Sequence, residues 1–452
     1  MNSMDIYNRM PIAIQNLLTT IKGYSYKKKR YGKVYKNALE EYLHRDYTDR
    51  EALIDYQWER IDELVHFAVN NSPFYKDFYK DINIDKIIEK RDISAFPLLD
   101  KEVVRNKIET MYALPEPAGQ FSNTSGTTGK SMRFLCATDD IQRRMAYLDY
   151  FKITHGFVPM KMRRASFSSA KIVPPHQKAH VYWRTNLAIN QRIYSGKHCK
   201  GDLVKYFIQD LNKYKPQSLD GYPSAMYEIA RYINDNNIML DFKPIAIFPT
   251  AETLLPHYRK EIEKAFKCPV RDQYASSEGA PFIVECKCGK LHVALDTGLI
   301  EFMDDGRMVV TCFETHGTPL IRYDIKDVAV LAQDQSCSCG WNTPIVDHIE
   351  GRTVDYVLSP RYGKITSVYL SLVSEDFHNC MKAMQFVQND INSIDVYLET
   401  DDRYQKYMDQ IIADKLHYYM GDEVTVRIHR VREIEKDSSG KFRFVVNNAL
   451  SK

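Results

Sequence analysis

Residues 123–131 are Asn-Thr-Ser-Gly-Thr-Thr-Gly-Lys-Ser, and the strand-like run Met-Arg-Phe-Leu-Cys follows at 132–136. The two glycines allow backbone N–H groups to turn inward, the hydroxyl side chains add donors, and Lys130 adds positive charge, which together suit a polyphosphate. The loop is not a Walker A motif, because Thr124 occupies the place of the first glycine and no helix follows. These residues alone leave two interpretations open, a phosphate-binding loop and an ordinary Ser/Gly hairpin.

Strands and helices alternate beyond this loop. Apolar residues predict a strand, a helix and a further strand within 243–274. Upstream, helical spacing marks residues 36–70, and Asp100 is placed to cap another helix. This order predicts an α/β fold with a large multi-sheet N-terminal body, residues 1–354, whose first part, residues 1–115, is helical.

The last hundred residues form a separate pattern. Apolar periodicity predicts, in order, a helix, two strands, a helix that stops before Gly421, and a last strand. This α-β-β-α-β order suits a small α+β domain, which we place at residues 355–452. The cluster of Ser359, Pro360 and Gly363 marks a hinge near its start, so this domain is expected to be a mobile cap on the body.

Length and composition exclude several classes of protein. The chain has 452 residues, and its 62 Lys and Arg against 59 Asp and Glu give a net charge of +3, which argues against a nucleic-acid-binding protein. Nine cysteines are too few for a disulfide scaffold in so long a chain. No stretch reaches the roughly 18 apolar residues that span a bilayer, and the N-terminal apolar and charged runs are in the wrong order for a secretory signal. A cytoplasmic enzyme or binding protein is expected.

One basic segment near the N-terminus stands apart. Between Lys22 and Lys36 there are seven basic residues, four tyrosines and no acidic residue. Two interpretations stand: contact with anionic lipid or another polyanionic partner, and an ordinary solvated turn and helix start.

Two short turns, Cys286-Lys287-Cys288-Gly289 and Cys337-Ser338-Cys339-Gly340, suggest a metal site. In a reducing compartment such a group binds metal more often than it forms disulfides. Four thiolates, or three with nearby His292, satisfy tetrahedral zinc, and a site without an open position is structural. The spacing within each pair is shorter than the usual Cys-x2-Cys, so unrelated reduced cysteines are the alternative. A zinc site here would brace residues 280–345.

Five segments resemble, in the same order, the motifs of the adenylate-forming superfamily, which includes acyl-CoA synthetases, peptide-synthetase adenylation domains and luciferases. They are the loop Thr124 to Lys130, Tyr274-Ala275-Ser276-Ser277-Glu278-Gly279, Arg322-Tyr323-Asp324-Ile325-Lys326-Asp327, Gly351-Arg352-Thr353-Val354-Asp355 and Ser439-Gly440-Lys441-Phe442-Arg443. Asp220 to Ser224, Pro249 to Glu252 and the Arg-Tyr order at 322–323 are most similar to the phenylacetate–CoA ligase branch. The opening residues resemble relatives of that branch among capsular polysaccharide biosynthesis proteins of the CapK type.

The resemblance implies ATP and magnesium, and a role for each matching residue. Such enzymes let a carboxylate attack the α-phosphorus of ATP, which forms an acyl-adenylate and releases pyrophosphate, while fixed cations stabilise the negative charge that develops. The nucleotide would be held by Thr124, Ser125, Gly126, Thr127, Thr128, Gly129, Lys130, Tyr274, Ser276 and Ser277. Glu278 would bind magnesium, and Lys441 would contact the α-phosphate and the attacking carboxylate. Asp327 would accept hydrogen bonds from the ribose hydroxyls, with Arg352 nearby.

The resemblance also implies a hinge and an acyl pocket. Asp355 occupies the place of the aspartate about which relatives rotate the C-terminal domain between adenylation and thioester formation. Tyr222, Pro223 and Ala251 lie in segments that line the acyl pocket of relatives, although Tyr222 is equally compatible with a core position.

Two positions depart from the family pattern. Lys326 replaces the usual glycine before Asp327, and Ser131 replaces the proline common after the phosphate loop. The first change is expected to alter the backbone beside the nucleotide, and the second is expected to be harmless.

The expected function is ATP-dependent activation of a carboxylic acid through an acyl-adenylate by an AMP-forming ligase, with CoA as the acceptor. One alternative passes the acyl group to an amine or hydroxyl acceptor, for instance on a surface-polysaccharide precursor. Another is a zinc-braced nucleotide-binding protein without catalysis, against which Lys441, Glu278 and Asp327 argue.

Overall fold

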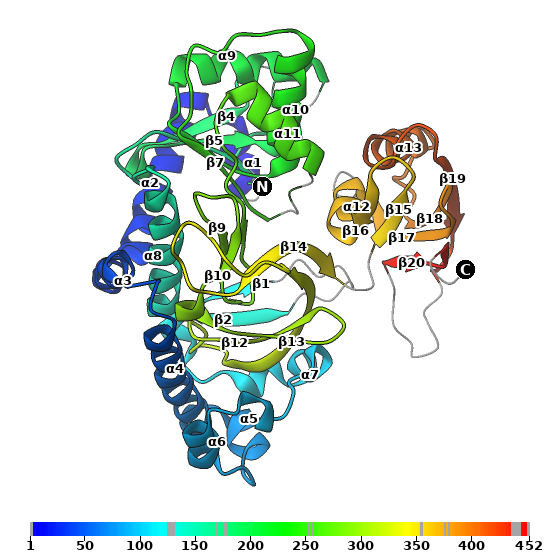
Figure 1. Ribbon diagram of the computed structural model, residues 1–452. Helices are drawn as coiled ribbons and strands as arrows, with labels where there is room; N and C mark the ends of the chain where they lie inside the picture. The colour runs from blue at the N-terminus through cyan, green and yellow to red at the C-terminus, as the bar shows by residue number, and fades with distance from the viewer. Residues whose placement is uncertain are drawn as a thin grey trace.

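The computed structural model describes residues 3–123, 132–168, 170, 172–174, 177, 179–199, 201–251, 254, 256–352, 356–374, 377, 380–434 and 444–449. Figure 1 shows a tall body with one sheet in its upper part and another in its lower part, and the C-terminal residues form a smaller unit beside it. The mixed α/β fold with a small C-terminal unit agrees with the sequence-based prediction.

Helices cover one side and the lower end of the body (Figure 1). They are α1 (Ser3–Arg9), α2 (Ile12–Arg30), α3 (Lys33–His44), α4 (Arg50–Asn71), α5 (Pro73–Phe78), α6 (Ile84–Lys90) and α7 (Lys101–Met111). The helical spacing predicted over 36–70 is interrupted between α3 and α4, and Asp49 begins α4 by accepting a hydrogen bond from the Ala52 N–H at 3.0 Å. Asp100 caps α7 as predicted. Among the helices that the structure describes, none combines the length and the apolar character needed to cross a membrane.

The upper sheet is an α/β layer. Its strands lie in the order β4 (Trp183–Asn186), β5 (Gln191–Ser195), β3 (Arg164–Ser168), β6 (Ser218–Gly221) and β7 (Ala246–Pro249). All neighbouring pairs are parallel except the edge pair of β4 and β5. Helix α8 (Thr138–Thr154) precedes this sheet, α9 (Val204–Tyr214) and α10 (Pro223–Asp235) connect its strands, and α11 (Pro256–Phe266) follows the last one. The predicted strand–helix alternation is therefore confirmed.

The lower sheet is built from antiparallel pairs. Its order is β11 (Gly298–Phe302), β12 (Arg307–Cys312), β13 (Leu320–Leu331), β14 (Ile345–Arg352), β10 (Leu291–Val293), β9 (Ile283–Glu285) and β8 (Gln273–Tyr274). The strand predicted up to residue 274 is shortened to β8, because Val270 still pairs with Ile247 of the upper sheet. The intervening residues therefore carry the chain from the upper sheet to the lower one.

A hairpin flanks the predicted phosphate loop. β1 (Gly119–Asn123) and β2 (Arg133–Ala137) are antiparallel, with Asn123 opposite Arg133. The strand-like run after the loop is therefore confirmed as β2. The connecting residues 124–131 lie outside the described residues.

The C-terminal unit contains β15 (Tyr356–Ser359), β16 (Gly363–Thr366), α12 (Ser367–Ser374), β17 (Met381–Asp390), β18 (Ser393–Thr400), α13 (Tyr407–Met420), β19 (Thr425–Val431) and β20 (Val445–Asn447). The predicted α-β-β-α-β order is present from α12 to β19. Gly421, with a φ of +98°, follows the last residue of α13 as predicted. β17 and β18 form the centre of a four-stranded sheet, with β19 and β20 at its edges.

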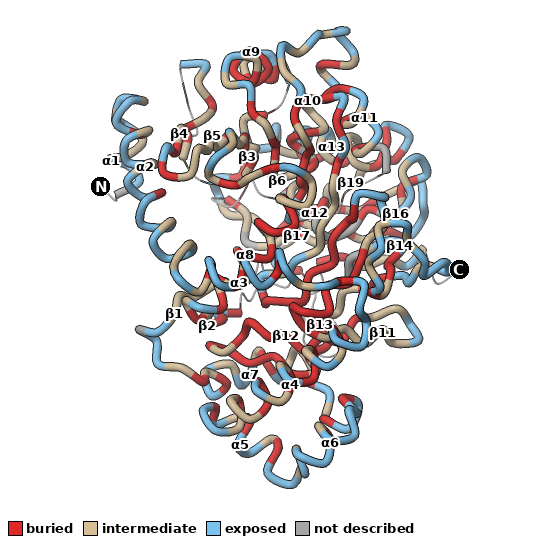
Figure 2. Tube along the Cα trace, turned by 60° about the vertical axis from the view of Figure 1, so that its left-hand side comes forward, coloured by how far each residue is buried: buried red, intermediate tan, exposed pale blue. Residues whose placement is uncertain are grey.

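Buried residues run through the interior of the molecule (Figure 2), and they form two hydrophobic cores. One joins the N-terminal helices and α8 to the lower sheet, and the other joins the upper sheet and its helices to the C-terminal unit. Tyrosines connect the C-terminal unit to the body: the ring centroids of Tyr258 and Tyr369 are 6.2 Å apart, and those of Tyr227 and Tyr418 are 6.4 Å apart. Apolar contacts of this kind favour one docked position of the unit.

Candidate functional site

Glu278, the predicted magnesium ligand, lies in the turn that follows β8. Its side chain is 7% exposed, and its Oε1 is 3.4 Å from the ammonium group of Lys101. Lys101 begins α7 and lies 177 residues earlier in the chain. A buried carboxylate needs a compensating charge, which Lys101 supplies here.

Gly279 and Arg144 hold this turn in place. Gly279 has a φ of +95°, and a Cβ at this position would come within 2.8 Å of the Thr315 side chain, so glycine is required on both counts. The guanidinium group of Arg144, from α8, donates to the carbonyl oxygens of Gly279 (2.7 Å) and Ala280 (3.0 Å). It also lies over the ring of Phe282, 4.4 Å from the centroid. The position of Glu278 is thus fixed from both sides of the turn.

A cavity of about 400 Å³ opens beside the Glu278 turn. Ser276, Ser277 and Glu278 line it on one side, and residues of β1, β2 and α8 line it on others. Its wall includes the apolar side chains of Phe121, Met145, Leu148 and Phe282. A cavity of this size, mainly apolar with a few placed polar groups, is typical of small-molecule sites. β1 and β2, the strands on either side of the predicted phosphate loop in the sequence, both contribute residues to this cavity.

Asp327, the predicted ribose ligand, lies on β13 and is paired with Tyr274. The Tyr274 hydroxyl donates a hydrogen bond to Asp327 Oδ2 at 2.7 Å. Burial and the Asp327 carboxylate raise the pKa of Tyr274 well above its usual value, so the phenol remains a donor at neutral pH. Arg352 lies directly opposite Asp327 on β14. Three predicted motif segments therefore meet in the lower sheet.

The family departure at Lys326 is accommodated by its surroundings. Lys326 has a φ of +68°, in the left-handed region that favours glycine. Its ammonium group is 2.7 Å from Asp324 Oδ2 and 3.0 Å from Asp100 Oδ2. These two ion pairs connect the backbone beside Asp327 to the start of α7 and offset part of the strain.

The predicted acyl-pocket residues lie at the carboxyl ends of β6 and β7. Tyr222 is half-buried before α10, Pro223 is buried in the first turn of that helix, and Ala251 is exposed with a φ of +70°. The cavity beside Glu278 is lined by other residues. The two regions adjoin, since the Gln273 amide donates to the Pro249 carbonyl oxygen at 3.1 Å. Carboxyl ends of parallel strands are common ligand sites.

Several predicted site residues lie outside the described residues. They are Thr124 to Lys130, Asp355 and Lys441, and Arg352 is placed by its backbone on β14. Their roles remain predictions.

A cluster of thiol and imidazole groups forms a second candidate site. The ligand atoms of Cys286, His292, Cys337 and Cys339 all lie within 4.8 Å of one another. Cys288 is exposed, and its Sγ is 3.2 Å from Ser338 Oγ, outside this group. Of the two ligand sets that the sequence left open, the structure brings together the one with three cysteines and His292.

The cluster fits tetrahedral zinc. Zinc–sulfur bonds of about 2.3 Å and zinc–nitrogen bonds of about 2.0 Å place two sulfur ligands about 3.8 Å apart, and a sulfur and a nitrogen about 3.5 Å apart. The Sγ atoms of Cys286 and Cys337 are 3.7 Å apart, and Cys339 Sγ is 3.5 Å from His292 Nε2. Nδ1 of His292 is 3.1 Å from Thr343 Oγ1, which orients the ring as second contacts of zinc-bound histidines do.

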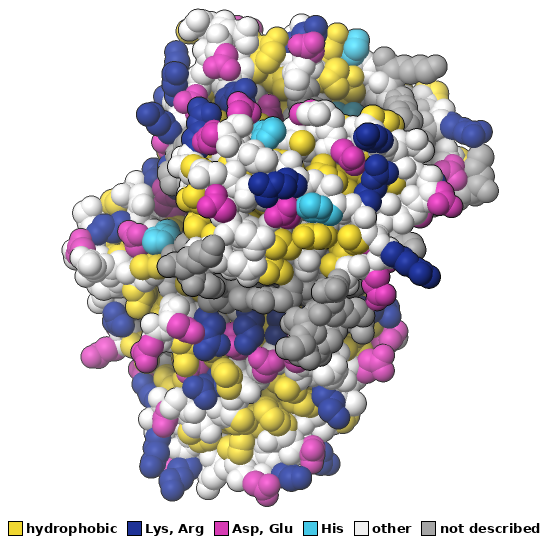
Figure 3. Space-filling model, turned by 90° about the vertical axis from the view of Figure 1, so that its right-hand side faces the viewer, with side chains coloured by type: hydrophobic (Ala, Val, Ile, Leu, Met, Phe, Trp, Pro, Cys, Tyr) yellow, Lys and Arg dark blue, Asp and Glu magenta, His cyan; other side chains and the backbone are white. Residues whose placement is uncertain are grey.

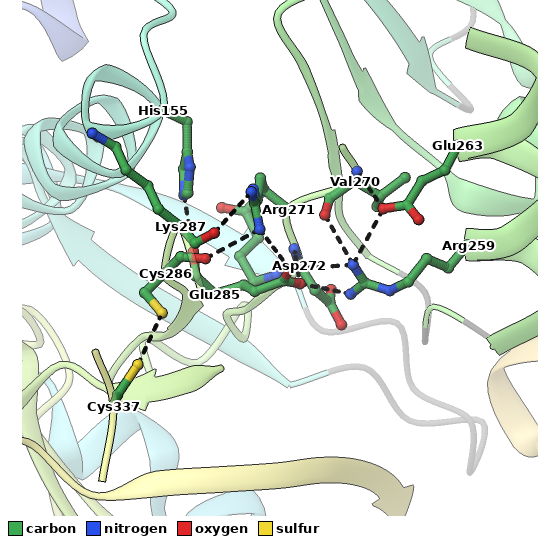
Figure 4. Close-up of polar contacts among 11 residues, drawn as sticks. His155, Arg259, Glu263, Val270, Arg271, Asp272, Glu285, Cys286, Lys287 and Cys337 are labelled. Atoms are coloured by element: carbon green, nitrogen blue, oxygen red, sulfur yellow. Dashed lines mark hydrogen bonds and ion pairs between the residues drawn. The ribbon is translucent and has the colours of Figure 1, made fainter. Parts of the chain in front are cut away.

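A buried ionic group joins the cluster to the strand that carries Tyr274 (Figure 4). Glu285, 2% exposed, accepts hydrogen bonds from Arg259 Nη2 at 2.6 Å, Arg271 Nη1 at 3.1 Å and the Asp272 N–H at 3.0 Å. Arg271 also donates to the Cys286 carbonyl oxygen at 3.2 Å. The cluster, α11 and the residues before β8 are therefore connected through one carboxylate.

Sequence patterns missed two residues of the Glu278 site. Lys101 and Arg144 are single cations on helices that come far earlier in the chain, and neither belongs to a motif. Only the packing of α7 and α8 against the lower sheet brings them to the turn, so local sequence offers no signal for them.

The sheets and the C-terminal unit define the fold of an adenylate-forming ligase. The structure of 2-hydroxyisobutyryl-CoA ligase in the postadenylation state, in complex with 2-HIB-AMP, is similar with a TM-score of 0.56 and 15% identity, over 87% of this chain and 89% of that chain. The same ligase in the thioesterification state, with 2-HIB-AMP and CoA, also has a TM-score of 0.56 at 15% identity, over 88% and 89% of the two chains.

The chain belongs to the CapK family. It is 39% identical over 449 residues to Protein CapK of Staphylococcus aureus, covering 98% of this chain and 99% of that protein. The family model for the CapK C-terminal domain matches residues 357–448. Phenylacetate-coenzyme A ligase of Thermus thermophilus is 22% identical over 337 residues, 68% of this chain and 72% of that protein. The predicted family resemblance is therefore confirmed.

Proposed function

We propose that this protein is an AMP-forming ligase that activates a carboxylic acid as an acyl-adenylate and transfers the acyl group to CoA. The main support is the meeting, around β8, of Glu278, the Tyr274–Asp327 pair and a cavity of about 400 Å³. These residues come from motifs that are widely separated in the sequence and that belong together in adenylate-forming ligases.

In the first step a carboxylate oxygen of the acid bonds to the α-phosphorus of ATP, and the bond from that phosphorus to the bridging oxygen breaks to release pyrophosphate. Asp327, oriented by Tyr274, would accept hydrogen bonds from the ribose hydroxyls. Lys130 and Lys441 would place positive charge beside the phosphates. Glu278 and the phosphates would hold Mg²⁺, which supplies further charge neutralisation when bound.

In the second step the CoA sulfur attacks the acyl carbonyl carbon, and AMP leaves. Rotation of the C-terminal unit about Asp355 would separate the two steps. Support comes from the relatives: a phenylacetate–CoA ligase matches two thirds of the chain, and 2-hydroxyisobutyryl-CoA ligase, solved with CoA, shares the fold.

A second candidate changes the acceptor and keeps the adenylate. The identity to Protein CapK, 39% over nearly the whole chain, is much higher than the 22% to the phenylacetate–CoA ligase. The chain is therefore more similar to a protein that is not named as a CoA ligase, which supports an acceptor other than CoA, such as an amine or hydroxyl on a surface-polysaccharide precursor.

We further propose that the cluster of Cys286, His292, Cys337 and Cys339 holds a structural zinc ion. Four protein ligands leave no position open for a substrate. The ion would brace the loop between β13 and β14 against the β9–β10 hairpin.

The decisive experiment is ATP–pyrophosphate exchange with a panel of carboxylic acids. At least one acid is expected to stimulate exchange, and Lys441→Ala is expected to abolish it while Lys86→Ala, at an exposed position on α6, does not. Failure of every acid to stimulate exchange, or full exchange in Lys441→Ala, would contradict the ligase activity. Adding CoA to the active mixture then separates the acceptors, because acyl-CoA forms only in the first candidate.

A further inference from the structure

Helix α2 packs on the body through its polar face. Gln15 Oε1 accepts a hydrogen bond from Nε of the fully buried Arg184 at 2.6 Å, and Asn16 Oδ1 accepts one from the Thr185 N–H at 2.9 Å. Thr20 Oγ1 donates to the Thr185 carbonyl oxygen at 3.2 Å. These polar side chains recur at helical spacing, so they form one continuous face against β4.

Two further contacts extend this face to the end of the helix. A Cβ on Gly23 would lie 2.0 Å from Asn186 Oδ1, so the helix backbone approaches the sheet closely there. The Lys27 ammonium group donates to the Ala188 carbonyl oxygen at 3.0 Å. Helix α2 is therefore firmly seated, and its orientation about its own axis is fixed.

The opposite face of α2 is apolar and exposed. Leu17, Ile21 and Tyr24 are 57%, 55% and 58% exposed, and Ile14 and Leu18 are also exposed. Their spacing of three and four residues aligns them in one stripe. A helix on a protein surface normally buries such a stripe, so the amphipathic pattern is inverted. Figure 2 shows the helix on the outside of the molecule, largely in the colour of exposed residues.

The exposed stripe has a strongly positive border. Lys22, Lys28 and Lys29 are exposed on α2, and the sequence from residue 6 to residue 39 contains eight basic residues and no acidic one. On the face with the C-terminal unit, by contrast, acidic and basic side chains are interspersed (Figure 3). The chain as a whole carries a net charge of only +3, so positive charge is concentrated at this helix.

We propose that α2 docks on an anionic membrane surface, with Ile14, Leu17, Leu18, Ile21 and Tyr24 inserted among the acyl chains and the lysines beside the head groups. An apolar stripe with lysines on its border is the pattern of helices that lie in the membrane interface. A soluble polyanion would use the lysines and leave the apolar side chains in water. The helix lies along the bilayer and does not cross it.

Membrane docking goes beyond the proposed ligase activity and does not depend on it. It would also affect access to the active site, because Arg30, the last residue of α2, lines the cavity that contains Glu278. The cavity would then open near the bilayer surface.

The test is co-sedimentation of the full chain with vesicles of phosphatidylcholine alone and with vesicles containing about 30% phosphatidylglycerol. Binding is expected only to the anionic vesicles. The variant Leu17→Gln/Leu18→Gln/Ile21→Gln is expected to lower the partition coefficient about a hundredfold, and Lys28→Gln/Lys29→Gln about tenfold. All five positions are exposed, so the variants are expected to fold.

Matched controls lie on other faces. Met239→Gln/Leu331→Gln/Tyr407→Gln and Lys86→Gln/Lys90→Gln change equally exposed residues and are expected to bind like the parent chain. Equal binding to both vesicle types, or full binding by the apolar variant, would overturn the proposal. Sedimentation velocity without vesicles tests whether the stripe instead binds a second copy of the chain. The parent chain is expected to sediment as a monomer, and a dimer that dissociates in the apolar variant would show that the stripe is a protein interface.

Discussion

Two turns leave neighbouring strands of the lower sheet, and their surroundings differ. The turn after β8 carries Glu278 and ends at Gly279, with a φ of +95°, and the turn after β9 carries Cys286 and ends at Gly289, with a φ of +86°. The first turn pairs with Lys101 through Glu278 and lines a cavity. The second faces three other ligand atoms at close range. A glycine of positive φ thus ends both turns. We call the Glu278 turn, which lines a cavity, the open turn, and the Cys286 turn, which is surrounded by ligand atoms, the closed turn.

From this difference we expect the Glu278 turn to take part in catalysis and the Cys286 turn to stabilise the fold. A site that acts on a substrate keeps space beside its charged group, whereas a structural metal site surrounds the ion with protein ligands. Glu285 joins the two, since its carboxylate holds both Arg271, which contacts the Cys286 turn, and the residue two positions before Tyr274. Changes at the open turn should therefore alter activity, and changes at the closed turn should alter stability.

Replacing Glu278 by Gln should have the largest effect on activity. The variant keeps the shape of the side chain and loses the charge that would hold magnesium, so ATP–pyrophosphate exchange should fall about 100- to 1000-fold, or about 3–4 kcal/mol. The free energy of unfolding should also fall, because the mostly buried Lys101 loses the carboxylate that it pairs with. Asp304→Asn, at an exposed position of the β11–β12 turn, is the control and should retain full exchange. Unchanged exchange in the Gln variant would remove Glu278 from the site.

The closed turn is tested by comparing Cys286→Ser with Cys288→Ser. Loss of Cys286 should reduce bound zinc well below one equivalent and lower the free energy of unfolding by on the order of 3 kcal/mol. Cys288 lies two residues away and outside the cluster, so its variant should keep one equivalent of zinc and near-parent stability. Metal analysis and denaturant unfolding measure both. Equal loss of zinc in the two variants would favour the four-cysteine set instead.

The contrast between local and distant interactions also explains what the sequence could predict. The Asp100 cap, the strand at β2 and the stop at Gly421 depend on neighbouring residues, so single motifs were enough. Glu278 and Asp327 could be predicted as site residues because they lie in extended family motifs. Lys101 and Arg144 were missed because helix packing, rather than local pattern, brings them to Glu278.

The ligands of the metal cluster and the orientation of α2 also depend on distant contacts, so local sequence could not predict them. The choice between Cys288 and His292 depends on the pairing of β9 with β10, which places His292 opposite Val284 and beside the Cys286 turn. The apolar stripe of α2 has ordinary helical spacing, so its sequence alone would place Leu17 and Ile21 inside. Only the hydrogen bonds of Gln15 and Asn16 to the body show that the helix is inverted.

Replacing Asp272 tests whether the ionic group around Glu285, which connects the two turns, contributes to stability. Burial raises the pKa of the Asp272 carboxyl from 3.8 to about 6. Between these values the folded chain binds a proton that the unfolded chain releases, so the free energy of unfolding falls as pH rises from about 4 to about 6. Asp272→Asn removes this penalty and should be more stable than the parent by on the order of 2 kcal/mol at pH 7, with no gain near pH 3. Denaturant unfolding at the two pH values measures this, and a gain of equal size at both would contradict the assigned cause.

Tyr274→Phe should give the smallest effect and should act on binding alone. The variant keeps the aromatic ring and loses the hydrogen bond that orients Asp327. This loss should weaken ATP binding by about 1–1.5 kcal/mol, which corresponds to roughly a tenfold rise in KM for ATP. Because Asp327 would contact the ribose equally before and during the reaction, kcat should stay nearly constant. Tyr407→Phe, at an exposed position of the C-terminal unit, is the matched control. A fall in kcat at unchanged KM would show that Tyr274 acts on the reacting groups, and the catalytic site would then include the end of β8 as well as the Glu278 turn.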